Sequence, residues 1–132
     1  MIVIDSSAII AIAAGEPSAH ECEKILEAEN SVLISTGTVA EVLIVAARRK
    51  LVKEVSDILK SSVTQTIDLT PVRAHLAATA YIRWGKSFDK AGLNFGDCFS
   101  YATAKEFDCP LLYIGDDFVH TDIRSAISSA PA

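Results

Sequence analysis

The stretch Met1-Ile2-Val3-Ile4-Asp5-Ser6-Ser7-Ala8 gives the clearest indication of the fold. Ile2 to Ile4 form a short β-branched run, which predicts a strand buried on both faces. Such strands occur in parallel sheets that helices cover on both sides. Asp5 follows the run directly, and Ser6 or Ser7 can cap a helix that begins there. We therefore expect a strand that leads straight into a helix, with an acid at the junction.

Strands and helices continue to alternate along the chain. Further strands are expected at Val32–Ile34, Thr66–Leu69 and Leu111–Ile114, with a possible short last one at Thr121–Ile123. Helical spacing predicts helices between them, including residues 36–49 and, after the Thr70-Pro71 start, residues 70–84. This order predicts an α/β fold, a three-layer α/β/α domain with a short, mostly parallel central sheet covered by helices.

The composition limits the domain count and the kinds of partner. With 132 residues, half of them hydrophobic, the chain can bury a core, so we expect a single domain over 1–132 with about 127–132 as a flexible tail. A net charge of −5 means that a nucleic acid would have to bind a local basic surface. Three cysteines without metal-ligand spacing predict reduced thiols in the cytoplasm. No apolar run could span a bilayer, so no membrane partner is expected.

Five acids stand near the predicted element boundaries or in an apolar segment. Asp5 and Asp116 follow strands and belong at the carboxyl edge of the sheet, where α/β folds bind ligands. Glu41 lies among apolar helical residues, and Asp97 lies in a first helical turn after a glycine. Asp117 is adjacent to Asp116. Carboxylates gathered in one cleft repel each other, so the group indicates a divalent cation and chemistry on a phosphate-containing substrate.

Each acid also has a purely structural explanation. Asp5 could cap a helix, and Glu41 could complete a capping box that begins at Thr38. Asp97 could serve the helix dipole, and the acids at 116 and 117 could belong to a surface turn. The position of an acid alone does not decide between these explanations.

Basic residues gather in two places, while other catalytic motifs are missing from the sequence. Arg48 to Lys50 are typical of a solvated helix end, whereas Arg83, Lys86 and Lys90 form a looser cluster near Asp97. No Ser-His-Asp arrangement, Walker loop or G-x-G-x-x-G motif is present. Ser6 could contact a phosphate or a metal-bound water, although a helix cap is its simpler role.

Four segments in order resemble the PIN-domain ribonucleases, and most closely the VapC toxins of bacterial toxin–antitoxin modules. They are Val3–Ala8, Thr38–Val42, Leu93–Cys98 and Leu111–Phe118. The resemblance implies a PIN-like domain in which Asp5, Glu41, Asp97 and Asp116 bind Mg²⁺ or Mn²⁺, with Asp5 and Asp97 as direct metal ligands. Many relatives have Thr-x-Asp at the last position, so Asp117 could share that role or take it.

The same resemblance implies an activity and partners. The protein would be a metal-dependent endoribonuclease that cuts a structured RNA such as tRNA or rRNA and so inhibits translation. A VapB-type antitoxin would inhibit it, and it would form a homodimer. Arg83, Lys86 and Lys90 would contact the RNA backbone.

Two other kinds of protein also place acids at the ends of strands. A haloacid-dehalogenase-type phosphatase needs a second Asp two residues after Asp5, where Ser7 stands, and a receiver domain needs an Asp after the middle strand, which ends in Ser35-Thr36. Two alternatives remain open: a housekeeping PIN nuclease without an antitoxin, and a non-catalytic PIN-like binding module. An upstream reading frame for a small partner would separate the first of these from a toxin.

Overall fold

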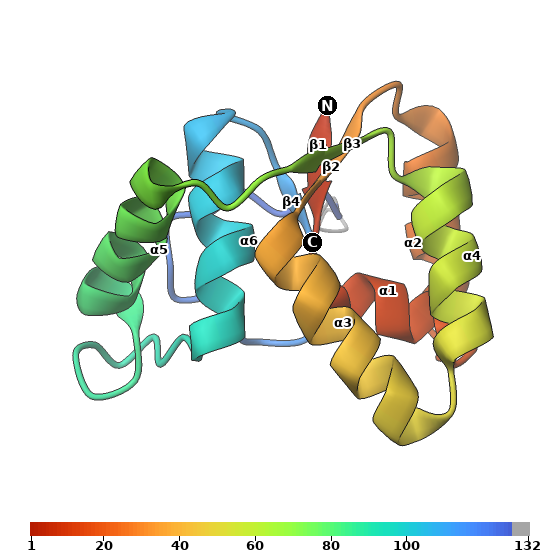
Figure 1. The fold of residues 1–132 in the computed structure, drawn as a ribbon, viewed down its shortest axis with the longest axis horizontal. Helices are drawn as coiled ribbons and strands as arrows, with labels where there is room; N and C mark the ends of the chain where they lie inside the picture. The colour runs from red at the N-terminus through yellow and green to blue at the C-terminus, as the bar shows by residue number, and fades with distance from the viewer. Residues whose placement is uncertain (128–132) are drawn as a thin grey trace, which may run out of the picture.

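Residues 1–127 are described by a computed structural model with four strands and six helices, in which two helices follow each of the first three strands (Figure 1). The strands are β1 (Ile2–Ile4), β2 (Val32–Ser35), β3 (Gln65–Ile67) and β4 (Leu111–Leu112). The helices are α1 (Ser6–Ala13), α2 (Ala19–Ala28), α3 (Thr36–Arg49), α4 (Val52–Ser62), α5 (Pro71–Trp84) and α6 (Phe95–Glu106). None of the helices in this range is long and apolar enough to cross a membrane.

The strands form one sheet in the order β3-β2-β1-β4, and every strand pair is parallel. Val3 is paired with Leu33 on one side and with Leu111 on the other, so β1 lies in the middle of the sheet. In a parallel sheet all carboxyl ends lie at one edge, which places Asp5 at the centre of that edge.

Alternate residues of the strands face two separate cores, because successive side chains of a strand point to opposite faces. Ile2 and Ile4 pack with residues of α1 to α4, while Val3 packs with residues of α5 and α6. Figure 1 shows these two groups of helices on opposite sides of the sheet. The expected three-layer α/β/α architecture is thereby confirmed. The three cysteines are buried and free, as small core residues.

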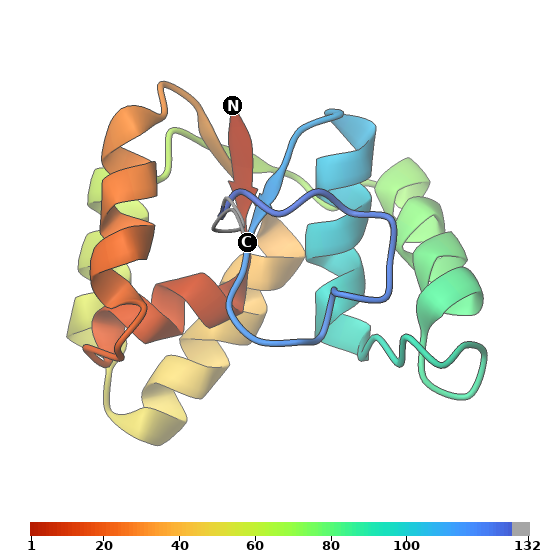
Figure 2. The same cartoon turned by 180° about the vertical axis from the view of Figure 1, so that it is seen from behind.

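The chain after the last strand differs from the prediction. β4 ends at Leu112 instead of Ile114, because the Ile114 amide donates to the Ser7 hydroxyl (3.1 Å) and the chain leaves the sheet. The short strand expected at Thr121–Ile123 is wrong, since these residues lie in bends and irregular chain. The chain returns to the sheet only at Ser125, which makes a single bridge to Leu111. Figure 2 shows this returning segment, in dark blue, on the side of the molecule that faces the viewer.

Candidate active site

Asp5 is buried at the end of β1, with 2% of its surface exposed, and it caps α1. Its Oδ2 accepts hydrogen bonds from the Ser7 amide (3.1 Å) and the Ser7 hydroxyl (2.7 Å). The expectation that Ser6 or Ser7 caps this helix is therefore wrong, because the helix begins at Ser6 and Asp5 is its N-cap. The other carboxylate oxygen, Oδ1, accepts from the Ser100 hydroxyl (2.5 Å). About four acceptor positions exist on a carboxylate, so these three bonds leave room for one more donor or a cation.

Ser100 connects three elements around Asp5. Its hydroxyl lies 3.2 Å from that of Thr38, and neither residue has any exposed surface. The bond to Asp5 thus joins β1 to α6, and the contact with Thr38 joins α6 to α3. Ser100 is not among the residues expected at the site from the sequence. Its position three residues after Asp97, on the same helix face, was the available signal.

Glu41 carries a buried carboxylate oxygen that lacks a partner. The N-cap of α3 is Ser35, whose hydroxyl accepts from the Gly37 amide, so the capping box between Thr38 and Glu41 does not form. Within residues 1–127, Glu41 Oε1 is buried without a hydrogen bond. Burial raises the pKa of Glu41, the nearby Ser6 hydroxyl lowers it, and the charges of Asp5 and Asp117 raise it further. An unpaired buried carboxylate is costly, which indicates a position meant for a cation or a water.

Asp97 lies in the first turn of α6 and is 6% exposed. It forms a capping box with Asn94: the Asn94 amide donates to Asp97 Oδ2 (3.0 Å), and the Asp97 amide donates to Asn94 Oδ1 (2.9 Å). Burial raises the pKa of Asp97 to about 7, the backbone bond from Asn94 opposes this, and the charges of Asp5, Asp117 and Glu41 add to it. Asp97 therefore caps α6 and is also coupled electrostatically to the other acids.

Asp116 and Asp117, which follow β4, differ in their effect on the other acids. Asp116 and Asp117 are both exposed in the loop that follows Gly115. The charge of Asp117 raises the pKa of both Glu41 and Asp97, and Asp116 is among the causes of neither shift. The structure therefore brings together Asp5, Glu41, Asp97 and Asp117. Ser6, also expected near the site, faces Glu41.

The basic residues lie on two sides of this cluster. Arg83, at the end of α5, stacks over the Trp84 ring with 4.4 Å between the guanidinium carbon and the ring centre. Lys86 and Lys90 are exposed in the loop that leads to the acidic end of α6. Arg49 and its neighbours are expected at the solvated end of a helix, and Arg49 does lie in the last turn of α3. It also lines a cleft of about 310 Å³ together with Ser6.

The arrangement suits hard cations bound partly through water. Within residues 1–127, no three His, Cys, Asp or Glu side chains form a ready-made metal cage. Mg²⁺ rarely needs one, because it keeps several waters and binds one or two carboxylates together with substrate phosphates. The oxygen-only donor set, the mutual repulsion of the acids and the unpaired Glu41 oxygen are consistent with such an ion.

Comparisons with known proteins found similar sequences and similar folds. The PIN-domain sequence profile matches residues 2–124. Ribonuclease VapC30 of Mycobacterium tuberculosis is 38% identical over 127 residues, which cover 94% of this chain and 97% of that protein. The crystal structure of VapC20 from the same species, described as a Sarcin-Ricin loop cleaving toxin, aligns with a TM-score of 0.74 at 20% identity, covering 93% of this chain and 96% of that one. A toxin–antitoxin complex from Klebsiella pneumoniae aligns with a TM-score of 0.68 at 19% identity, covering 92% and 93%.

Proposed function

Because the chain belongs to the PIN-domain family, and within it to the VapC ribonucleases, we propose that it is a Mg²⁺-dependent endoribonuclease and the toxin of a toxin–antitoxin module. The observation that carries this proposal is the convergence of Asp5, Glu41, Asp97 and Asp117 at one sheet edge, with a buried Glu41 oxygen left unpaired. Such a cluster is unfavourable in isolation and becomes favourable when a cation neutralises it.

Asp5 and Asp97 are the residues that we assign as direct metal ligands. Asp5 has one acceptor position left after its three hydrogen bonds, and Asp97 has a second oxygen beyond the one that accepts from Asn94. We assign the fourth acidic position to Asp117, because its charge acts on Glu41 and Asp97. Mn²⁺ prefers the same oxygen ligands and would also fit.

The chemistry that a bound Mg²⁺ supplies is charge neutralisation at the scissile phosphate and a lowered pKa of the attacking water. Glu41 or Asp117 accepts the proton of that water at a carboxylate oxygen. Burial raises the pKa of Glu41, and a higher pKa makes a carboxylate the stronger base. Ser6 and Ser7 hold Glu41 and Asp5 in place, and Ser100 fixes the second oxygen of Asp5.

Substrate and partners follow from the relatives and from the surface charges. We propose a structured RNA such as tRNA or rRNA as the substrate, in line with the Sarcin-Ricin loop named for VapC20. Arg83, Lys86 and Lys90 would contact its backbone near the acidic end of α6. A VapB-type antitoxin, a homodimeric assembly and a cytoplasmic location complete the proposal, the antitoxin being supported by the toxin–antitoxin complexes among the structural neighbours.

The test compares the wild-type chain with Asp97→Asn on total RNA, with Mg²⁺ or with EDTA, and maps the new RNA ends. We expect discrete cuts that need Mg²⁺ and that disappear in the variant. A chain that cuts RNA equally well in EDTA, or an Asp97→Asn variant as active as the wild type, would refute the proposed site. Growth arrest on expression, relieved by the product of a small upstream gene, would distinguish a toxin from a housekeeping nuclease.

A further inference from the structure

The loop that carries Asp117 has no regular secondary structure, yet it is tethered at its beginning. Its first amide, that of Ile114, donates to the Ser7 hydroxyl (3.1 Å), and the same hydroxyl donates to Asp5 Oδ2 (2.7 Å). In the middle of the loop Phe118 is 1% exposed and packs on Tyr113 with 5.0 Å between the ring centres. Asp117 itself is exposed, so the position of its carboxylate depends on the backbone that carries it.

A second tether stands at the end of this loop. Asp122 Oδ1 accepts from the Tyr101 hydroxyl (2.5 Å), and Asp122 Oδ2 accepts from Lys105 Nζ (3.1 Å). The Tyr101 hydroxyl in turn accepts from Trp84 Nε1 (2.9 Å). The hydrogen bond from Tyr101 lowers the pKa of Asp122, and Lys105 adds to the effect, so the carboxylate binds as an anion. Bonds of this charge-assisted kind are about twice as strong as neutral ones.

Both tethers lead back to the elements that carry the acids. Tyr101 lies on α6, one helical turn after Asp97, and is 7% exposed. The segment between Phe118 and Asp122 is short and closed by turns, with the Thr121 amide bonded to the Phe118 carbonyl (3.0 Å). A shift of Asp122 away from α6 would therefore move the backbone at Asp117 relative to Asp97.

We propose that Asp122 is a positioning residue, which holds Asp117 against the acidic cluster through Tyr101 and Lys105 on α6. This inference rests on the proposed function, since it concerns the geometry of the proposed metal site. Asp122 touches neither the metal nor the RNA in this proposal, and it acts only through the loop. Residues that orient the groups around a metal commonly change metal affinity by about 10- to 100-fold when they are replaced, and we expect the lower figure here because Asp117 is not one of the two direct ligands.

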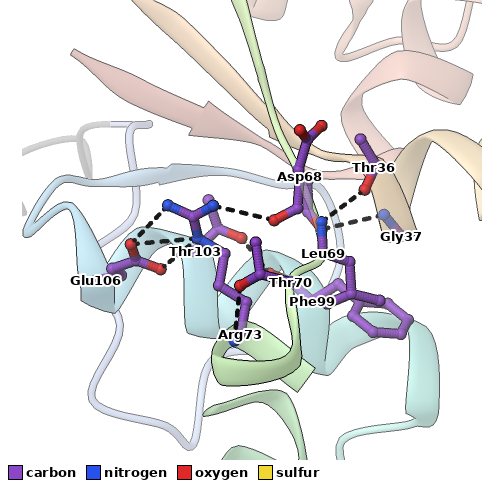
Figure 3. A network of polar contacts seen from close by, with 10 residues as sticks. Thr36, Gly37, Asp68, Leu69, Thr70, Arg73, Phe99, Thr103 and Glu106 are labelled. Atoms are coloured by element: carbon purple, nitrogen blue, oxygen red, sulfur yellow. Dashed lines mark hydrogen bonds and ion pairs between the residues drawn. The ribbon is translucent and has the colours of Figure 1, made fainter. Parts of the chain in front are cut away.

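A second ion pair of α6, which is made with α5, offers a matched control. Figure 3 shows Arg73 of α5 beside Glu106 of α6, with Arg73 Nε 3.1 Å from Glu106 Oε1 and Nη2 3.1 Å from Oε2. Arg73 Nη1 also donates to the Asp68 carbonyl (3.1 Å). Glu106→Gln and Asp122→Asn each remove one negative charge and one ion pair of α6. Only the second of these pairs holds the loop of Asp117.

The experiment measures Mn²⁺ binding from the electron paramagnetic resonance signal of the free ion, in the full chain at pH 7.5. Asp122→Asn is compared with Glu106→Gln and with Tyr101→Phe, which keeps every charge. Amide hydrogen exchange at Val119 and Thr121 reports on the loop, and thermal denaturation reports on the fold. We expect Asp122→Asn and Tyr101→Phe to weaken Mn²⁺ binding by about 10-fold and to speed exchange in the loop. Glu106→Gln is expected to leave both unchanged.

The outcomes separate this inference from the function on which it rests. Wild-type Mn²⁺ affinity in Asp122→Asn, even with a loosened loop, would overturn the positioning role and leave the ribonuclease proposal standing. Equal weakening by Glu106→Gln would also overturn it, because the effect would then be one of charge or general stability. A wild-type chain that neither binds Mn²⁺ nor cuts RNA would refute the proposed function, and the positioning role with it.

Discussion

Replacing Gly96 with alanine adds one methyl group directly against the carboxylate of Glu41. A Cβ at this position would lie 1.7 Å from Glu41 Oε2 and 2.5 Å from its Cδ. Ordinary contact begins near 3.4 Å, so the carboxylate would have to move by about 1.7 Å. The backbone of Gly96 is helical, and alanine can adopt its conformation without strain. The substitution should therefore change only the position of the Glu41 carboxylate.

The expected change in stability is small, whereas the expected loss of activity is large. Alanine favours a helix over glycine by up to about 1 kcal/mol, which offsets the displacement of a flexible side chain, so the free energy of unfolding should stay within about 1 kcal/mol of the wild-type value. Cleavage depends on where the Glu41 oxygen lies. A misplacement of about 1 Å in a catalytic group can cost about 100-fold, so we expect a loss of at least that size.

Single-turnover cleavage of a fluorescently labelled RNA, with saturating Mg²⁺, would measure the loss, and urea denaturation would measure the stability. The control is the double variant Gly96→Ala/Glu41→Ala beside Glu41→Ala alone. If the methyl group acts through Glu41, the two should be equally slow, because the second change then finds nothing left to displace. Wild-type cleavage by Gly96→Ala would refute the reasoning, and so would a double variant far slower than Glu41→Ala.

Three further predictions concern the acids and the basic cluster. Asp5→Asn and Asp97→Asn should each lower Mg²⁺-dependent cleavage by at least about 1,000-fold, because an amide is a poor ligand for Mg²⁺. The circular dichroism spectrum of both variants should stay native. Retained cleavage would contradict the assignment of these two residues as metal ligands. The pKa of Asp97 is about 7 in the folded chain against 3.8 ordinarily, so between these values the folded chain holds a proton that the unfolded chain has released. The metal-free protein should accordingly lose stability as the pH rises from about 4 to about 7, and urea denaturation in EDTA should show a flatter profile for Asp97→Asn; parallel profiles would contradict this. Lys86→Ala and Lys90→Ala should each reduce the slope of log K for RNA binding against log salt concentration by about 0.7. Lys53→Ala, on the exposed surface of α4, should leave that slope unchanged. An equal effect of all three substitutions would argue against a local RNA contact.

The sheet and its helices could be predicted from sequence because local signals and long-range packing agree. Ile2 to Ile4 are apolar on both faces, and both faces are in fact covered. α3 and α5 have the expected starts and ends, with Thr70 as the cap and Gly85 after the last residue of α5. The failure at Thr121–Ile123 has a definite cause. Those residues are committed to side-chain bonds, notably that of Asp122 with Tyr101, which no local pattern reveals.

The candidate acids could be chosen from the sequence, whereas their hydrogen-bond partners could not. Position after a strand or in an apolar segment was enough to select Asp5, Glu41 and Asp97. Ser100 escaped notice, because a serine within a helix has common structural explanations. Gly96 was evident as the glycine before Asp97, but no local pattern reveals that it lies against the Glu41 carboxylate. The choice between Asp116 and Asp117 depends on the conformation of an irregular loop, which no local pattern describes, and our proposal of Asp117 rests on the action of its charge on Glu41 and Asp97.

Asp5 shows why a structural and a catalytic explanation of one residue need not compete. As the N-cap of α1 it accepts the Ser7 amide, and the same carboxylate accepts the Ser7 and Ser100 hydroxyls. These bonds occupy three acceptor positions of the carboxylate. The remaining position points in one direction, because β1, α1 and α6 together hold the carboxylate in place. A free carboxylate would have to be ordered when the cation arrives, at a cost in side-chain entropy. The cap removes that cost in advance, so under the proposed function the N-cap of the first helix is also a carboxylate already oriented to bind the metal.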